Sequence, residues 1–545
     1  MAQIFKKLLK LLQKEFFPLC IILFFVFLTS KALFQPGFFR TTDDITTVRI
    51  IYLVKELQRN YWLQNFPVRI SAELAHGFGY NLYMFYGPLV YYVGAILMMF
   101  LKLSHIVATK WVYVFPLLTG PFFCYFALRQ KFGRIPSLLG TAIFSFFPFR
   151  GYDTYIRGGV GEAWAMAFLP AAIGSLFLAE KKKIGYILFS FFLSLVIISH
   201  NISGLLILSF IFVLGLFAYR RKREFWLSLL LTLGLSAFYW LPAAFYLSIV
   251  KVTYSNQNTG QVLNFLDPLV NLIRIQIPYN PEGRYSGIFF WIFLAVLTTF
   301  VIHIKKIKRQ ARRDFLFWFF SGVFLYFLLS AESKFIWQLT LPISRLLQFP
   351  WRILIILSFI FPFVVAYSIS FIKKPIFQVL IFIPVCILVL IFLPSFKPKE
   401  YSFFYEYSAE DTGICATTWE DEYLPTWAKE CAGGPARQEI EVRKGSFNLF
   451  ASNKLSYEGS SDASDETELI VYKYYFPGWH VEVDGKSSKL DYTFSKGGIF
   501  KTKIPAGLHL IRVYYEKTPV MWIADLISLV SVGLFLLWIA RSKHL

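Results

Sequence analysis

The chain has 545 residues, of which 56% are hydrophobic and 16% charged, and its formal net charge is +22. A single soluble core is excluded, because the apolar runs reach the roughly 20 residues that a bilayer-spanning helix needs. In a soluble protein a net charge this positive would indicate binding to nucleic acid. Here much of it lies beside apolar runs, where it faces lipid headgroups, so we expect membrane lipids and no nucleic acid as partners.

Seven clusters of lysine and arginine predict which side of the membrane each loop occupies. Cytoplasmic loops retain basic residues, so the chain between two neighbouring clusters should cross an even number of times. The clusters lie at 6–14, 129–134, 181–183, 220–223, 305–313, 373–374 and 541–543. This pattern predicts a multi-pass protein of the cytoplasmic membrane with both termini in the cytoplasm.

The first two clusters enclose three apolar runs, at 16–34, 81–101 and 106–128. Three crossings would leave the second cluster on the wrong side, so one run should not cross. The middle run is the expected exception, because it is rich in the tyrosines that collect at interfaces and is interrupted by Gly87-Pro88. The first run follows a basic segment and lacks a small-residue cleavage site, which predicts a retained span.

The remaining runs bring the expected total to about twelve transmembrane helices. These runs lie at about 135–149, 164–180, 184–199, 202–219, 225–243, 288–304, 314–330, 353–372, 376–394 and 520–540. We therefore expect three parts: a transmembrane module over 1–394 with outer loops at 35–110, 150–163 and 245–287, an extracytoplasmic segment over 395–519, and a final helix with a cytoplasmic tail over 520–545.

The outer C-terminal segment alternates between apolar and polar residues with period two from about 438 to 516. With turns at Asp484-Gly485 and Gly497-Gly498, this pattern predicts a small β-sandwich close to the membrane. Cys415 and Cys431 precede it on the side where thiols can be oxidised. A disulfide between them would stabilise a short loop by about 3 kcal/mol, and two unpaired thiols are the alternative.

The first candidate site is the acidic pair Asp43 and Asp44, directly after the first span and before an amphipathic run at 45–62. Paired carboxylates at this place could act as a general base or hold a divalent cation. Alternatively, they only cap the following helix and complement its dipole. The residues alone leave both interpretations open.

The second candidate site is the glycine-rich outer loop that holds Asp153, Arg157 and Glu162. A planar guanidinium donates two hydrogen bonds at once, and neighbouring glycines let backbone N–H groups approach the same anion, so the loop is suited to a phosphate. An ordinary solvated loop with a snorkelling arginine is the alternative. His200 and Arg352 lie at outer ends of later spans, where an ionisable group usually serves a ligand, a proton path or a partner. An interfacial histidine and a headgroup-binding arginine are their alternatives.

The order of several motifs resembles a known family. The chain resembles the C-type superfamily of lipid-phosphosugar-dependent glycosyltransferases, more closely the bacterial 6-pyruvoyl-tetrahydropterin-synthase-related membrane proteins, and at its end the YfhO family. The matching stretches are Asp43-Asp44 with Arg49, 67–69, 77–79, 85–88, 155–158 with Glu162, 199–201, 348–352 and 476–479 with 483–485. Thr47 stands near a position where the family pattern often has histidine. A pterin synthase would need a zinc-binding histidine cluster, which the seven scattered histidines do not supply.

The resemblance implies an α-helical, C-type glycosyltransferase-like membrane module with the small β-sandwich outside. It implies a polyprenyl-phosphate sugar as donor and an envelope glycan or lipid as acceptor. Asp43 or Asp44 would be the catalytic base, and Asp153 or Glu162 would orient the acceptor or a cation. The lipid-phosphate-binding residues would be Arg157, His200 and Arg352.

Two other functions remain open at this point. A lipid or glycan transporter or flippase would carry charged or broken helices near mid-membrane, whereas the candidate groups here crowd the outer ends. A non-catalytic membrane protein that presents its β-domain to a glycan would tolerate loss of Asp43 and Asp44.

Overall fold

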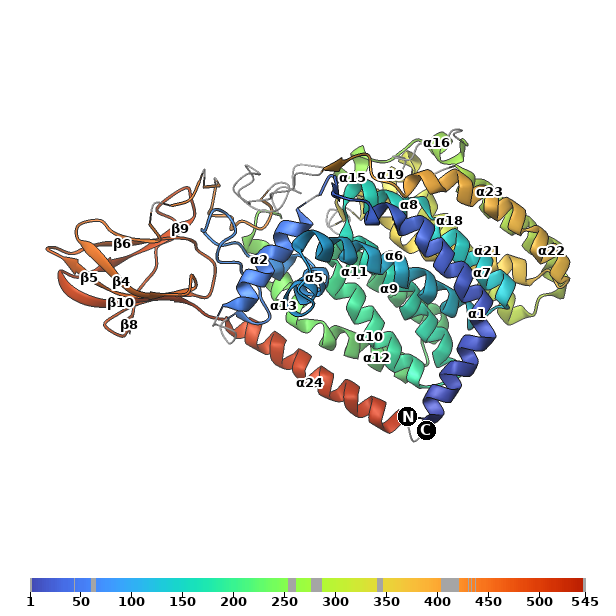
Figure 1. Cartoon of the computed structure of the whole chain (residues 1–545), viewed down its shortest axis with the longest axis horizontal. Helices are drawn as coiled ribbons and strands as arrows, with labels where there is room; N and C mark the ends of the chain where they lie inside the picture. Colours follow the sequence, from blue (N-terminus) through green and yellow to red (C-terminus); the bar gives the residue numbers. More distant parts are fainter. Residues whose placement is uncertain are drawn as a thin grey trace.

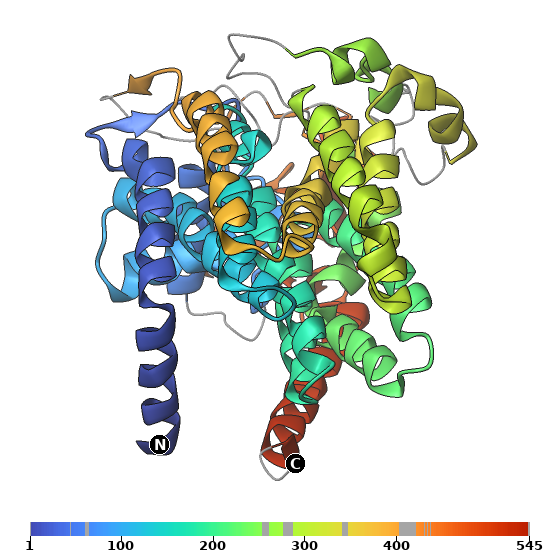
Figure 2. The ribbon, with the colours of Figure 1, turned by 90° about the vertical axis from the view of Figure 1, so that its right-hand side faces the viewer.

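The computed structural model shows a helical bundle with a β-structure at one end, which we call the β-domain (Figure 1). It describes residues 2–43, 45–59, 65–252, 261–275, 287–340, 347–402, 421–429, 431–432, 434–436 and 438–542. The predicted site residues Asp44 and Cys415 lie outside the described residues. Figure 2 shows that α1 and α24 both extend to the same end of the molecule, which we call the termini end.

The bundle combines long apolar helices with short connecting ones. They are α1 (Ala2–Ser30), α2 (Thr46–Gln58), α4 (Leu82–Phe85), α5 (Leu89–Phe100), α6 (His105–Arg129), α7 (Arg134–Ser145), α8 (Pro148–Tyr152), α9 (Val160–Ala179), α10 (Ile184–Ser199), α11 (Asn201–Leu214), α12 (Arg223–Leu235), α13 (Ala237–Tyr246), α15 (Gln261–Asn264), α16 (Leu269–Ile273), α17 (Ile288–His303), α18 (Arg309–Phe327), α19 (Lys334–Leu339), α21 (Leu354–Ser370), α22 (Pro375–Leu380), α23 (Phe382–Phe392) and α24 (Pro519–Ser542).

Within the described residues, eight helices are long and apolar enough to cross a membrane, or nine if one bent pair is a single span. This confirms a polytopic helical protein but gives fewer full spans than the twelve expected. Four of the expected spans do not form a single long apolar helix, and each has a physical reason. At 1.5 Å per residue, α7 and α10 are only about 18 and 24 Å long. The α18 helix begins with charged residues, and the chain bends by 71° between Arg223–Leu235 and Ala237–Ile249.

The apolar run at 81–101 does not form a full span, as predicted. It is divided into α4 and α5, and the break coincides with Gly87-Pro88. The α5 helix has 12 residues, about 18 Å, against a hydrocarbon core of about 30 Å. It packs closely on α2, because a Cβ added at Gly94 would lie 2.5 Å from Cδ1 of Ile50.

We expect cysteines on either side of α6 to react on opposite sides of the membrane. Ser104 is exposed before α6 and Gln130 follows its end, so Ser104→Cys should react with an impermeant thiol reagent on intact cells. Gln130→Cys should react only after permeabilisation. The unsubstituted chain, with free Cys20, Cys124 and Cys386, gives the background labelling. Labelling of Ser104→Cys only after permeabilisation would contradict the predicted topology.

The predicted β-structure in the C-terminal part is confirmed as two antiparallel sheets that share one apolar core. The five-stranded sheet has the order β4-β5-β10-β7-β8 and the three-stranded sheet β3-β6-β9. The strands are β3 (Ile440–Val442), β4 (Ser446–Ser452), β5 (Ser456–Ala463), β6 (Thr467–Tyr474), β7 (Trp479–Val483), β8 (Lys486–Ser487), β9 (Ile499–Ile504) and β10 (Gly507–Tyr515). A separate short pair, β1 (Phe38–Phe39) with β2 (Tyr401–Ser402), joins the segments that follow α1 and α23.

The β-domain is fastened to the loop that follows α2. Ile70 and Ala72 of this loop belong to the β-domain core. The amine of Lys473 on β6 donates hydrogen bonds to the carbonyls of Gly77 (2.6 Å) and Ala72 (3.3 Å), and burial lowers its pKa to about 8. A buried amine with two backbone acceptors fixes the docking geometry more specifically than apolar contact alone.

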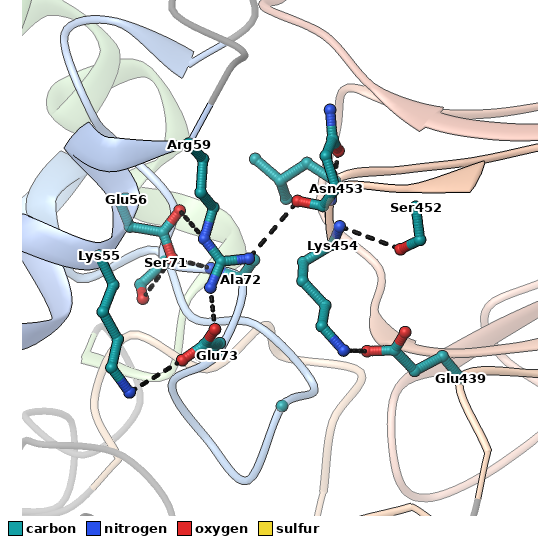
Figure 3. Close-up of polar contacts among 12 residues, drawn as sticks. Lys55, Glu56, Arg59, Ser71, Ala72, Glu73, Glu439, Ser452, Asn453 and Lys454 are labelled. Atoms are coloured by element: carbon teal, nitrogen blue, oxygen red, sulfur yellow. Dashed lines mark hydrogen bonds and ion pairs between the residues drawn. The ribbon is translucent and has the colours of Figure 1, made fainter.

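Polar side chains surround this joint (Figure 3). Arg59 forms an ion pair with Glu73 and donates to the carbonyl of Asn453 at 3.4 Å. On the β-domain, Lys454 pairs with Glu439 at 2.9 Å. These contacts lie around the joint between the β-domain and the loop that follows α2.

Candidate functional site

Glu162, in the first turn of α9, is the centre of a buried cluster of charges. Its side chain is 1% exposed, and both oxygens are bound by Arg157: Nη1 lies 2.7 Å from Oε2 and Nη2 lies 3.0 Å from Oε1. Nε of Arg352 also donates to Oε1 at 2.9 Å, although 190 positions separate the two residues in the sequence. The fold therefore brings the second outer loop and the segment before α21 to one carboxylate.

The backbone of the loop is shaped by glycines. Asp153–Arg157 forms a π-helical turn that ends at Gly158, whose φ of +78° is in the left-handed region that favours glycine. A Cβ at Gly158 would lie 2.3 Å from Oγ1 of Thr41, and one at Gly159 would lie 2.4 Å from Oδ1 of Asp153. These positions need glycine for close packing around the charged cluster.

His200 contacts the same cluster from the start of α11. Its Nε2 lies 3.8 Å from Oε1 of Glu162, and its Nδ1 accepts a hydrogen bond from the backbone N–H of Ser203 at 3.2 Å. Because Nδ1 is an acceptor there, the proton of the neutral ring is on Nε2, toward Glu162. Burial lowers the pKa of His200 to about 3, so the ring is neutral and is not one of the cations of the site.

The segment before α21 holds Arg352 rigidly. Nη1 of Arg352 donates to the carbonyl of Leu347 and to Oε1 of Gln348, both at 2.8 Å. Its guanidinium also lies over the ring of Phe349, 5.3 Å from the centroid. Such fixed contacts leave the guanidinium little freedom to reorganise when an anion binds.

A second cluster surrounds Asp43, whose side chain is 34% exposed. Its Oδ1 lies 3.2 Å from Nη2 of Arg49, and its Oδ2 accepts from the hydroxyl of Tyr86 at 3.4 Å. The guanidinium of Arg49 lies over the ring of Tyr86 at 4.4 Å and donates to the hydroxyl of Tyr91 at 3.1 Å. Asp43 is therefore an oriented carboxylate that remains accessible to a ligand.

Backbone hydrogen bonds join the two clusters. The N–H of Asp43 donates to the carbonyl of Arg157 at 2.8 Å, and that of Thr42 donates to Ile156 at 2.9 Å. The hydroxyl of Tyr113 donates to the carbonyl of Gly158 at 3.0 Å. The accessible carboxylate and the buried cations thus form one site.

The buried cluster combines two guanidinium groups, of Arg157 and Arg352, with two carboxyl groups, of Asp153 and Glu162. Burial raises the pKa of Asp153 well above its usual range, and the neighbouring carboxylate of Glu162 raises it further. Nη1 of Arg157 donates to Oδ1 of Asp153 at 2.8 Å, and this guanidinium lowers the pKa of Asp153, in the opposite direction. Oδ2 of Asp153 is buried and has no hydrogen-bond partner among the described residues, so one polar atom of this carboxyl group is unsatisfied.

Comparison with known proteins identifies the family. The family model described as "6-pyruvoyl-tetrahydropterin synthase related domain; membrane protein" matches residues 83–399, which is more than half of the chain. The chain belongs to this family. The matched region contains Asp153, Arg157, Glu162, His200 and Arg352. It begins at residue 83 and therefore does not contain Asp43. It confirms the predicted family and an integral membrane protein.

Other comparisons of this 6-pyruvoyl-tetrahydropterin synthase related protein are less informative. No curated protein matches the chain. The solved structures similar to it include arabinofuranosyltransferase AftD from Mycobacteria (TM-score 0.48, 14% identity, 73% of this chain and 28% of that chain) and the Archaeoglobus fulgidus oligosaccharyltransferase (TM-score 0.43, 13% identity, 69% of this chain and 53% of that chain). The chain therefore spans about a quarter and a half of their lengths. Both TM-scores are below 0.5, too low to establish a shared fold.

The structure overturns one interpretation of Asp43. The N-cap residue of α2 is Ile45, and no side chain caps the helix there. Capping by Asp43 is therefore wrong, and its carboxylate binds Arg49 instead. Arg49 and Tyr91 were missed as site residues. The sequence could have indicated Arg49, because it lies on the apolar face of an amphipathic helix, four residues before Leu53 and eight before Leu57.

Other predicted residues lie apart from this site or outside the described residues. Cys431 is disulfide-bonded, but Cys415 is not described, so their pairing stays a prediction. Among the described residues, no group of three histidine, cysteine or acidic side chains is arranged to hold a metal ion. A divalent cation that uses Asp44 stays a prediction.

Proposed function

We propose that this protein is a membrane glycosyltransferase that transfers a sugar from a polyprenyl-phosphate donor to an envelope glycan or lipid on the outer face of the cytoplasmic membrane. One observation carries this proposal. An accessible, oriented carboxylate, Asp43, is joined by a backbone hydrogen bond to Arg157, in a buried cluster that holds two guanidinium groups. Transfer from a lipid phosphate needs both a base for the acceptor and cations for the leaving phosphate.

The reaction is a single displacement at the anomeric carbon. The carboxylate of Asp43 takes the proton of an acceptor hydroxyl, and the acceptor oxygen forms a bond to C1 of the sugar. The bond between C1 and the phosphate oxygen breaks, and its electron pair leaves with the polyprenyl phosphate. In-line attack from the opposite face inverts the anomeric centre.

Arg157 and Arg352 stabilise the charge that develops on the leaving phosphate. Among the described residues, Nε of Arg157 and Nη2 of Arg352 have no hydrogen-bond partner, so both groups retain donors for an anion. Both oxygens of Glu162 are already engaged. We therefore assign Glu162 to positioning these two arginines, in place of orienting the acceptor.

The placement of the charges also separates this proposal from a transporter. Glu162 is the third residue of α9, Arg352 lies two residues before the start of α21, and His200 immediately precedes α11. All three lie at helix ends, whereas a transport path is expected to place ionisable groups near the middle of the bilayer.

We expect the purified full-length protein to release polyprenyl phosphate from at least one donor in a panel of polyprenyl-phosphate hexoses and pentoses. Release is measured over time with an added lipid or glycan acceptor, with and without a chelator, and against heat-inactivated protein. Turnover that survives chelation would show that the carboxylate suffices without a divalent cation. The absence of turnover with every donor would contradict the proposed function.

A further inference from the structure

A cavity of about 970 Å³ lies at the termini end of the bundle, away from the site described above. It is lined by residues at the ends of α9, α11, α17 and α21 and at the start of α18. This volume lies within the range of about 300–1,000 Å³ that is typical of small-ligand pockets. The proposed transfer reaction does not use it.

Helix geometry places this cavity on the other face of the membrane. On α9, Glu162 belongs to the site and Ala179 lines the cavity, 17 residues later. At 1.5 Å per residue this is about 26 Å, close to the thickness of the hydrocarbon core. Similarly, His200 immediately precedes α11 and Leu214, 14 residues later, ends it and lines the cavity, a rise of about 21 Å. Glu15, in the middle of α1, pairs at 2.9 Å with Arg129, the last residue of α6.

The rim of the cavity is strongly basic. Its two carboxylates are engaged: Glu180 pairs with Lys131 at 2.5 Å, and Asp314 accepts from Gln310 at 3.0 Å. By contrast, five other lysines on the rim form no ion pair with any residue that the structure describes. They are Lys222, Lys306, Lys308, Lys373 and Lys374.

The floor of the cavity is aromatic. Phe132, Phe177 and Trp318 all pack around the ring of Phe363, with centroid distances of 5.3, 5.4 and 4.6 Å. Each of the four side chains is no more than 8% exposed. A basic rim alone is the ordinary signature of a cytoplasmic loop. A hollow that combines this rim with an apolar floor is not explained by membrane topology.

We propose that this cavity binds a phosphate-bearing amphiphile, with the anionic headgroup on the lysine rim and the apolar part on the aromatic floor. A free phosphate would satisfy the rim and leave the floor in water, so a lipid fits the lining better. The occupant is an anionic lipid of the leaflet at the termini end. This inference does not depend on the proposed transfer reaction.

Binding can be measured with the purified full-length protein by native mass spectrometry. The probes are dioctanoyl phosphatidic acid, dioctanoyl phosphatidylcholine and inorganic phosphate. We expect saturable binding of phosphatidic acid, at least tenfold weaker binding of phosphatidylcholine, and competition by phosphate only at much higher concentration. Binding of inorganic phosphate without the lipid, or equal binding of both lipids, would overturn the proposal.

Neighbouring lysines provide a matched control. Lys306 and Lys308 line the cavity, whereas Lys305 and Arg309 in the same exposed segment do not. Lys306→Glu with Lys308→Glu should weaken phosphatidic acid binding at least tenfold, and Lys305→Glu with Arg309→Glu should change it less than twofold. Equal losses in both pairs would show headgroup attraction without a site and overturn the proposal.

A second variant tests the floor without changing any charge. Ala311 lines the cavity, so Ala311→Trp should fill part of it and reduce lipid binding. Its thermal unfolding, compared with that of the unsubstituted protein, shows whether the variant is folded. A folded Ala311→Trp protein with unchanged phosphatidic acid affinity would place the lipid outside the cavity and overturn the proposal.

Discussion

Replacing Asp43 by asparagine is expected to lower the rate of sugar transfer by ~10²–10⁴-fold, the range typical for loss of a general base. The amide keeps the size of the side chain and can still accept a hydrogen bond from Tyr86, but it cannot take a proton from an acceptor hydroxyl. The double variant with Asp44→Asn should be equally inactive. Turnover of polyprenyl-phosphate sugar by the purified variants measures the effect.

The same substitution also removes the partner of Arg49, so a structural effect must be separated from a chemical one. Glu73→Gln is a matched control, because Glu73 is similarly exposed (30%) and also pairs with an arginine, Arg59, in the outer region. Glu73→Gln should keep transfer within about twofold, since surface ion pairs contribute little. If folded Asp43→Asn protein loses less than tenfold in rate, Asp43 is not the base.

The positions of the helices could be predicted from the sequence because charge and hydropathy are local properties of the chain. The basic clusters predicted that the run at 81–101 would not cross, and α5 is too short to do so. The bend between α12 and α13 could not be predicted in the same way. The break falls near Ser236, without a proline at the break itself. The first turn of α13 is held by a distant contact, because the hydroxyl of Tyr239 donates to the carbonyl of Phe85 at 3.0 Å.

The site was only partly predictable, because its contacts join distant parts of the chain. Topology alone placed Asp43, Glu162 and Arg352 on one side of the membrane. It could not show that Arg352 and Arg157 share the carboxylate of Glu162, since that contact depends on how α9 and α21 pack. Nor could it show that burial neutralises His200, a residue that the sequence placed among the phosphate-binding groups.

Replacing Arg157 by lysine is expected to weaken binding of the polyprenyl-phosphate donor at least tenfold, or about 1.4 kcal/mol. Lysine keeps the positive charge but loses the planar fork that holds Oε1 and Oε2 of Glu162 together. Its single ammonium group cannot make these two bonds, contact Asp153 and still donate to a phosphate. Donor affinity and thermal unfolding should both be measured, because an arginine that only supports the fold would alter stability and leave the affinity of the folded protein unchanged.

Arg129→Lys is the control for Arg157→Lys. Arg129 also binds a carboxylate, Glu15 at 2.9 Å, but it lies at the termini end, far from the proposed donor site. Its substitution should therefore leave donor affinity within about twofold.

We expect Arg352→Lys to behave like Arg157→Lys. Both guanidinium groups contact Oε1 of Glu162, and each has one donor without a partner among the residues that the structure describes. Near-normal donor affinity in a folded Arg157→Lys protein would remove this residue from the phosphate site. It would also weaken the proposed transferase function, since the buried cluster would then lack one of the two cations assigned to the leaving phosphate.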